Sequence, residues 1–311
     1  MFNQLPKLFA FSKNLIQAKL VGAPIVALES AVITHGLPRP ENLNIARELE
    51  AEVRENGANP ATIALLEGKI HIGLTEQQLE ELANMEKTRK ISLRDFGIAL
   101  AGGLSGGTTV AATLFAAAQV GIRVFATGGI GGVHRGAPFD VSADLPQLGK
   151  SPVLVVCAGA KAILDLPATH EVLETQGIPV IGFQTDEFPA FYSPSSGLPV
   201  DHRVETPKEA AQVAMKAWEA GVKSAVLLVV PPPAKAALPA GSMEAAIQTA
   251  LDEAVEQGIH GAATTPFLLS RVSALTGGES LHANLALLGN NARVAAQVAV
   301  EMANINKLEA Y

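Results

Sequence analysis

The chain has 311 residues, of which 48% are hydrophobic and 17% are charged, and this composition excludes a disordered chain. The formal net charge of −7 and the lack of any run of Lys or Arg argue against nucleic acid as a polymeric partner. Cys157 is the only cysteine, so a disulfide framework is excluded and a reducing compartment is expected.

Residues 1–20 carry scattered charges and lack a continuous apolar core, so we interpret them as a leading helix or arm and not as a signal peptide. No apolar run in the sequence approaches the roughly 18 residues that a membrane-spanning helix requires. We therefore expect a cytoplasmic protein that has no membrane partner.

Short apolar runs of strand type alternate with helical patterns along most of the chain. The predicted strands are residues 24–30, 61–66, 69–74, 122–127, 152–158, 178–183 and 224–230. Most of these runs are apolar throughout, which is typical of strands that are covered on both faces. The second and third runs flank Gly68 and are predicted to form a hairpin, so the sheet should be mixed.

Helix starts are predicted between the strands. Thr75 and Thr206 begin capping-box patterns, and Ser242 and Thr265 are expected to cap two later helices. The pair Asn290–Asn291 suggests a break or cap in the last helix.

The alternation of strands and helices predicts an α/β fold with right-handed crossovers. We expect three layers, α/β/α, with a mixed, mostly parallel central sheet. Residues 1–311 should form a single α/β domain, in which residues 240–311 make a helical outer layer. In such sheets ligands bind beyond the carboxyl ends of the strands, so the strand exits are the places to search for a site.

The stretch TGGIGGVHRGAPFDVSAD, residues 127–144, follows the fourth predicted strand. Its four glycines at positions 128–132 would let backbone N–H groups approach an anion, and His134 and Arg135 can pair with phosphate oxygens. A tight turn without a ligand is the alternative, because the spacing matches neither a Walker loop nor a dinucleotide loop.

Asp140, Ser142 and Asp144 close the same stretch. Ser142 can cap a short helix, which needs no ligand. The alternative is a hard divalent cation such as Mg²⁺ or Mn²⁺, which takes one or two carboxylates and completes its shell with water and substrate oxygens. The spacing alone leaves both interpretations open.

The stretch VVCAGAKAILD, residues 155–165, places Lys161 in the turn that leaves a buried strand, where a helix is predicted to open. The helix dipole and burial would both favour the neutral amine, which is a nucleophile toward carbonyl carbon. Alternatively, the stem of Lys161 packs on the helix while its amine reaches water. Glu29 ends the first strand and is either the partner of a neighbouring charge or a proton donor with a raised pKa.

Several stretches together resemble the pseudouridine-5′-phosphate glycosidase family, which includes the indigoidine synthase A-like proteins. They are VALESAVITHGLPRPEN (26–42), NPATIALLEGKIHIGLT (59–75), KISLRD (90–95), residues 106–145, VVCAGAKAILD (155–165), GFQTDEFPAFY (182–192) and residues 265–292. The matches occur in order and extend from about residue 20 to about residue 300, so the resemblance is specific.

The resemblance implies reversible cleavage of the carbon–carbon glycosidic bond of pseudouridine 5′-phosphate, giving uracil and ribose 5-phosphate. It implies a divalent cation, Mn²⁺ or another such as Mg²⁺, with Asp140 as its ligand, and a homotrimer. Lys161 is implied to attack the anomeric carbon and to carry the ring-opened ribose as a Schiff base, with Glu29 as the proton donor. The implied substrate-binding residues are Lys90, Val110, Ser142, Ala143 and Asp144, together with Thr127 and His134 near the phosphate and Asn284 near the uracil.

The chain also departs from the family pattern. It has Ala31 where threonine is usual and Glu41 where glutamine is usual, and the loop before Asp140 is a few residues shorter. Two other functions remain open: a non-catalytic or pigment-pathway relative that binds a sugar phosphate, and a phosphosugar kinase. A kinase would need a nucleotide cradle and a general base, and no convincing pair of these is visible in the sequence.

Overall fold

The computed structural model describes residues 7–259, 261 and 264–309. Its main strands are β2 (Ile25–Leu28), β3 (Asn59–Leu66), β4 (Lys69–Ile72), β7 (Val124–Ala126), β10 (Leu154–Cys157), β12 (Val180–Phe183) and β14 (Val226–Val229). Each overlaps one of the strands predicted from the sequence, so all seven of those predictions are confirmed. β10, β12 and β14 are buried along their whole length, as their apolar sequences require.

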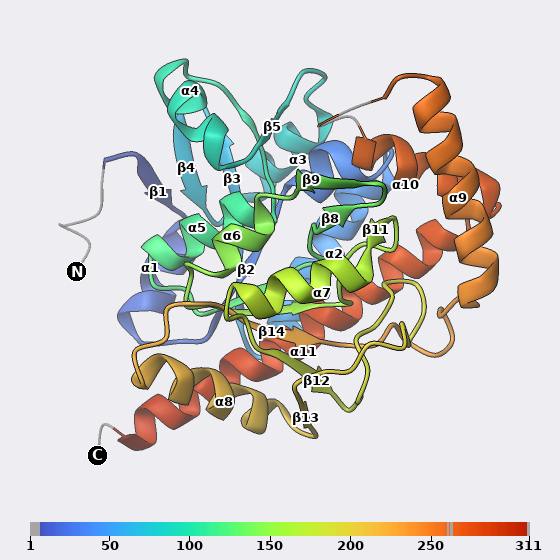
Figure 1. Cartoon of the computed structure of the whole chain (residues 1–311). Helices are drawn as coiled ribbons and strands as arrows, with labels where there is room; N and C mark the ends of the chain where they lie inside the picture. The colour runs from blue at the N-terminus through green and yellow to red at the C-terminus, as the bar shows by residue number, and fades with distance from the viewer. Residues whose placement is uncertain (1–6, 260, 262–263, 310–311) are drawn as a thin grey trace.

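Seven further strands, most of them two or three residues long, were not predicted. They are β1 (Phe9–Phe11), β5 (Arg89–Ile91), β6 (Gly106–Thr108), β8 (Val133–His134), β9 (Ala137–Val141), β11 (Leu164–Asp165) and β13 (His202–Val204). β8, β9 and β11 form a separate small antiparallel sheet. This small sheet lies beside the strand exits, so it helps to build the site described below (Figure 1).

The main sheet has 11 strands in the order β1-β4-β3-β2-β7-β10-β14-β12-β13, with β6 also paired to β3 and β5 paired to β6. β3 is antiparallel to β4 and to β6, whereas the other pairs in the sheet are parallel. The predicted hairpin is confirmed: Gly68 has a φ of +71°, and a Cβ there would lie only 2.9 Å from the carbonyl oxygen of Leu100. The sheet is therefore mixed and mostly parallel, as expected.

Helices form two layers around this sheet. The helices are α1 (Lys13–Leu20), α2 (Glu41–Glu55), α3 (Glu76–Asn84), α4 (Phe96–Ala101), α5 (Val110–Gln119), α6 (Asp144–Leu148), α7 (Leu166–Thr175), α8 (Pro207–Glu219), α9 (Ala240–Glu256), α10 (Thr264–Leu275) and α11 (Glu279–Glu309), with the short turns η2 (Val32–Gly36) and η3 (Leu93–Asp95). α11 contacts α2 and α8 and packs on β2, β7 and β10, while α5, α6 and α7 cover the opposite face (Figure 1). The three-layer prediction is confirmed.

Helix starts agree with the sequence in part. Thr75 caps α3 in a complete capping box, and the Thr206 hydroxyl accepts a hydrogen bond from the backbone N–H of Glu209 at the start of α8. The prediction for Ser242 is wrong: the N-cap of α9 is Pro239 (φ −62°, ψ 130°), and Ser242 lies in the first turn, where its hydroxyl donates to Pro239 O.

Two further helix predictions are also wrong. Thr265 lies inside α10, which begins at Thr264. α11 runs without a break through Asn290 and Asn291, because the Asn291 side chain points inward and bonds to a loop of the main sheet.

Of the described helices, none is both long enough and apolar enough to cross a membrane.

Candidate active site

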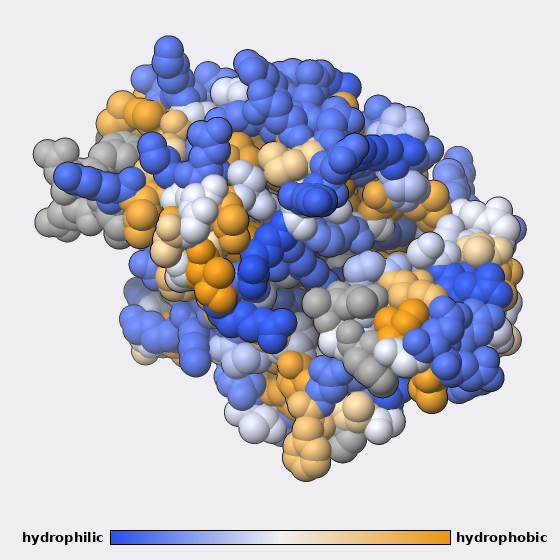
Figure 2. Space-filling view, turned by 90° about the horizontal axis from the view of Figure 1, so that it is seen from above, coloured by the Kyte–Doolittle hydropathy of each residue, from blue (hydrophilic) through white to orange (hydrophobic). Residues whose placement is uncertain are grey.

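The carboxyl ends of three neighbouring strands define the site. β2, β7 and β10 are adjacent and parallel, so the residues that follow them meet at one edge of the sheet. Glu29 follows β2, Thr127 follows β7, and Lys161 follows β10. Seen from above, the molecule is hollowed near the middle of this face, and the border of the hollow is mostly hydrophilic (Figure 2).

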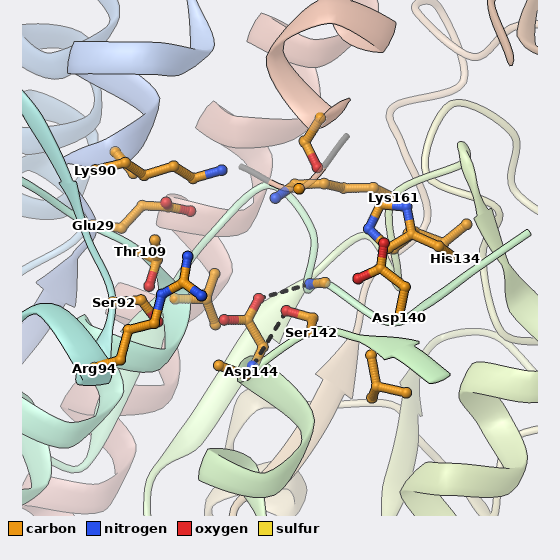
Figure 3. A pocket seen from close by; sticks show the side chains of 18 of the residues that line it. Glu29, Lys90, Ser92, Arg94, Thr109, His134, Asp140, Ser142, Asp144 and Lys161 are labelled. Atoms are coloured by element: carbon orange, nitrogen blue, oxygen red, sulfur yellow. Dashed lines mark hydrogen bonds between the residues drawn. The ribbon is translucent and has the colours of Figure 1, made fainter. Parts of the chain in front are cut away.

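Two adjoining cavities occupy this edge, with volumes of about 340 Å³ and about 60 Å³. Every site residue that the family resemblance implies lines one of them. The larger cavity is lined by Val110, His134, Asp140, Ser142, Ala143 and Asp144, and the smaller by Thr127 and Asn284. Glu29, Lys90 and Lys161 line both cavities, so these three side chains stand at the junction (Figure 3).

Lys161 lies in an irregular segment and not in the first turn of a helix, so that prediction is wrong. The residues after it form β11, which pairs with β8, and the next helix starts only at Leu166. The Lys161 N–H donates to Ile130 O at 3.1 Å. Gly159 has a φ of +83°, and a Cβ there would lie 2.3 Å from Pro189 O, so the turn before Lys161 requires glycine. The dipole of the helix that follows, α7, therefore does not act on Lys161 as the sequence suggested.

Glu29 is a partly buried carboxylate whose pKa is raised above its ordinary value of 4.5. Burial is the main cause, because it disfavours the charged form. The positive charge of Lys161 and a hydrogen bond from the Thr127 hydroxyl to Oε1 oppose the rise without cancelling it. Glu29 therefore keeps its proton to a higher pH than an exposed glutamate, as a general acid must.

Lys90 on β5 enters the junction from another direction (Figure 3). Burial lowers its pKa, and the nearby charge of Lys161 lowers it further, while Asp144 and Glu29 act in the opposite sense. Two amines thus share a small, partly buried volume with one carboxyl group. Their mutual repulsion favours the state in which one amine is neutral.

Asp144 is buried and binds two backbone N–H groups, those of Ala111 and Gly131, at 2.8 Å each. It thereby ties the start of α5 to the glycine-rich loop. Ser142 accepts a hydrogen bond from the Asp144 N–H at 3.2 Å, although the N-cap position of α6 is Ala143. Ser142 therefore supports the start of a short helix and also lines the larger cavity.

The glycine-rich loop is packed more tightly than an open anion cradle would be. A Cβ on Gly131 would lie 2.2 Å from Ser142 Oγ, and one on Gly129 would lie 2.6 Å from the Phe191 ring. The N–H groups of Ile130 and Gly131 are already bonded, to Gly159 O and to Asp144. The structure favours the alternative stated for this loop, in which its glycines allow a tight turn.

Two residues expected near a phosphate, Arg135 and Thr127, form hydrogen bonds to other protein groups instead. Arg135 pairs with Glu244 and donates to the carbonyl groups of Ala162 and Leu164, so it is outside the cavity wall and the expectation is wrong. The Thr127 hydroxyl donates to Glu29 and lines only the smaller cavity. His134 does line the larger cavity.

Several wall residues of the larger cavity were not singled out from the sequence, among them Ser92, Arg94 and Thr109. Arg94 is exposed and forms no ion pair with any described residue, so its guanidinium is available to an anionic ligand. Ser92 and Arg94 belong to the stretch KISLRD, which the family resemblance had included. The spacing of that stretch alone gave no reason to choose them.

Asp140 on β9 is exposed and faces the larger cavity beside His134 (Figure 3). Among the residues that the structure describes, no group of three or more His, Cys, Asp or Glu side chains is placed to hold a metal ion. A single carboxylate with an adjacent imidazole still fits Mg²⁺ or Mn²⁺, because these ions keep several water ligands and bind substrate oxygens. The donor set excludes a closed, all-protein metal cage in the described part of the chain.

Comparison with known proteins agrees with this architecture. The family model for indigoidine synthase A like protein matches residues 14–301. The chain is 58% identical to a pseudouridine-5′-phosphate glycosidase from Herpetosiphon aurantiacus over 287 residues, covering 90% of this chain and 93% of that protein. It is 54% identical to one from Caldanaerobacter subterraneus, covering 91% and 93%.

Two solved structures share the fold. The prealnumycin C-glycosynthase AlnA, solved in complex with ribulose 5-phosphate, superposes with a TM-score of 0.90 at 38% identity, covering 98% of this chain and all of that chain. An indigoidine synthase A-like protein from Thermotoga maritima superposes with a TM-score of 0.85 at 38% identity, covering 91% and 94%. By sequence and by structure, this chain belongs to the indigoidine synthase A-like protein family.

Proposed function

We propose that this protein is a pseudouridine-5′-phosphate glycosidase, which reversibly cleaves the carbon–carbon bond between ribose and uracil and releases uracil and ribose 5-phosphate. The relatives that carry this name are 50–58% identical over most of the chain. The observation that carries the proposal is the junction itself, where the amines of Lys161 and Lys90 meet the Glu29 carboxyl group between two cavities.

The two cavities suggest how the substrate lies. The larger one has Arg94, Lys90 and His134 in its wall, and it would take the ribose 5-phosphate portion. The smaller one is lined by Phe191, Leu288 and the Asn284 amide, which suits a flat base that needs a hydrogen-bond partner. The bond to be cleaved would then lie at the junction, within reach of Glu29 and Lys161.

The chemistry follows from these positions. The Lys161 amine, in its neutral form, attacks C1′ as the bond from C1′ to the ring oxygen breaks and the ribose opens. The nitrogen, cationic after the attack, loses a proton and regains its lone pair, and the ring oxygen takes up a proton. The nitrogen lone pair then forms a C=N bond to C1′ while the electrons of the C1′–C5 bond pass to uracil C5. Glu29 supplies the proton that C5 receives, so uracil leaves as a neutral molecule. Water hydrolyses the Schiff base, which releases ribose 5-phosphate and restores the amine.

The proposal includes a divalent cation, Mn²⁺ or Mg²⁺, held by Asp140 with water and substrate oxygens. When bound, such an ion neutralises negative charge on the sugar phosphate. The family resemblance also favours a homotrimer, and the single buried Cys157 suits a cytoplasmic location.

The alternatives are less well supported. A protein that only binds a sugar phosphate has no need of a lysine amine and a carboxyl group with a raised pKa at one point. The identity to the C-glycosynthase is 38%, against 58% to a glycosidase. The test is to incubate the protein with uracil, ribose 5-phosphate and Mn²⁺ and to follow the ultraviolet spectrum: formation of pseudouridine 5′-phosphate supports the proposal, and an unchanged spectrum contradicts it.

A further inference from the structure

Asn291 is a fully buried polar residue on α11 that touches neither cavity. Its Nδ2 donates to the carbonyl oxygen of Thr127 at 2.8 Å and to that of Gly128 at 3.3 Å. Its Oδ1 has no hydrogen-bond partner among the described residues. A buried acceptor without a partner is unfavourable, and an apolar side chain of similar size would avoid it. The two donated bonds therefore need a reason beyond filling space.

Those bonds fix the backbone at the exit of β7. The Thr127 N–H donates to Val156 O at 3.0 Å, so Thr127 is held by β10 on one side and by Asn291 on the other. The Thr127 side chain is buried, and its hydroxyl donates to Oε1 of Glu29. A continuous chain of hydrogen bonds thus runs from α11 to the carboxyl group at the cavity junction.

The two carboxyl oxygens of Glu29 differ in their hydrogen bonds. Oε1 accepts from Thr127, whereas Oε2 forms no hydrogen bond with any described residue. An acidic proton is therefore directed to Oε2, because Oε1 already receives a donor. The other charged groups that act on Glu29 are Lys161, Lys90 and Asp144, and none of them forms a hydrogen bond to it in the described structure.

We infer that Thr127 and Asn291 are positioning residues for the reaction: Asn291 fixes Thr127, and Thr127 orients Glu29 so that Oε2 carries the proton delivered to uracil. The inference rests on the proposed function. It assigns to Thr127 a role at the acid instead of at the phosphate.

The first test compares T127V with T127S. Valine has the shape of threonine but no hydroxyl, whereas serine keeps the hydroxyl. T127V should lower kcat for cleavage by on the order of tenfold to a hundredfold with little change in KM, because only the proton transfer is impaired. Loss of a donor to the carboxylate should also move the alkaline limb of the kcat profile to higher pH. T127S should retain the wild-type limb. A T127V enzyme with wild-type kcat and an unmoved limb would overturn the inference.

The second test concerns Asn291. N291L removes both donated bonds, while N290A at the next position of α11 is the matched control, because Asn290 bonds only to Pro231 and Arg293. N291L should lower kcat and move the alkaline limb as T127V does, and the double variant should be little worse than T127V alone, because both residues act through one carboxyl group. Fully additive losses would contradict the inference. If N291L does not fold, the T127V and T127S pair decides.

A measurement without turnover separates this inference from the proposed function. The Glu29 carboxyl group can be titrated by infrared difference spectroscopy with ¹³C-labelled glutamate, using E29Q to assign the band. T127V should titrate at higher pH than the wild type, and T127S should not. If the wild-type protein fails to form pseudouridine 5′-phosphate but this shift is seen, the proposed function fails while the contact stands. An unshifted titration in T127V overturns the inference whatever the activity.

Discussion

The amines of Lys90, on β5, and Lys161, after β10, approach the same cavity junction, and the charge of Lys161 contributes to the lowered pKa of Lys90. In a partly buried volume, two like charges raise each other's free energy, so burial and repulsion both disfavour the doubly charged state. The site therefore lowers the pKa of the Lys90 amine by burial and by charge repulsion.

Replacing Lys90 by methionine should slow Schiff-base formation. K90M removes one of the two amines at the junction and with it a polar contact to the sugar phosphate in the larger cavity, so the rate of imine formation should fall on the order of tenfold. K90R keeps the charge and is the matched control. Single-turnover kinetics with ribose 5-phosphate measures this step, and equal rates for K90M and wild type would show that Lys90 plays no part in it.

Replacing Glu29 by glutamine should separate the two steps of the reaction. E29Q should still form the Schiff base with ribose 5-phosphate, but cleavage of pseudouridine 5′-phosphate should fall by about 10²- to 10⁴-fold because the proton donor is missing. Trapping and turnover assays on the same preparation measure both. If E29Q loses both Schiff-base trapping and cleavage of pseudouridine 5′-phosphate, Glu29 has a role other than proton donor.

The same substitution should stabilise the fold. The pKa of Glu29 is raised in the folded protein, so the protonated carboxyl group favours folding. This contribution to the free energy of unfolding is complete below the ordinary pKa of 4.5 and is lost as the pH rises through the pKa of the folded protein. E29Q removes this loss. Thermal unfolding should show that the melting temperature of E29Q exceeds that of wild type at pH 8 by more than at pH 5. A constant difference would mean that the Glu29 pKa is not raised.

Asp144 should matter for stability more than for substrate contact. D144N keeps one acceptor oxygen but presents an NH₂ group to the second backbone donor, so one of the N–H groups of Ala111 and Gly131 loses its partner. The expected cost is about 1–3 kcal/mol in the free energy of unfolding, measured with urea. S142A removes only one weak bond and should cost less. Equal stability of D144N and wild type would contradict this structural role.

The long strands could be predicted because they are apolar on both faces, a pattern that does not depend on their partners. β8 and β11 could not be predicted, because a two-residue strand is defined only by its pairing with another strand. The same pairing occupies the residues after Lys161, where a helix was expected, so the helix begins later in the chain. The same limit applies inside the site. Glu29 and Lys161 were visible as polar residues at strand ends, whereas the bond from Thr127 to Glu29 depends on β2 and β7 being neighbours, which the sequence does not state.

Asp140 should determine the metal requirement without affecting the fold. It is exposed and forms no hydrogen bond with any described residue, so D140N should unfold at the wild-type temperature. The affinity of the protein for Mn²⁺ should fall by about tenfold or more, because the carboxylate proposed to hold the ion is neutralised. Electron paramagnetic resonance of free Mn²⁺ measures the affinity directly. Unchanged binding in D140N would place the cation elsewhere.

The most direct test of the account is to trap the covalent intermediate. Wild-type protein is incubated with ribose 5-phosphate, reduced with borohydride and digested, and the peptides are mapped by mass spectrometry, with K161R as the control. We predict that the reduced adduct is found on Lys161 and is absent from K161R. An adduct on Lys90, or no adduct in a preparation that turns over pseudouridine 5′-phosphate, would contradict the account.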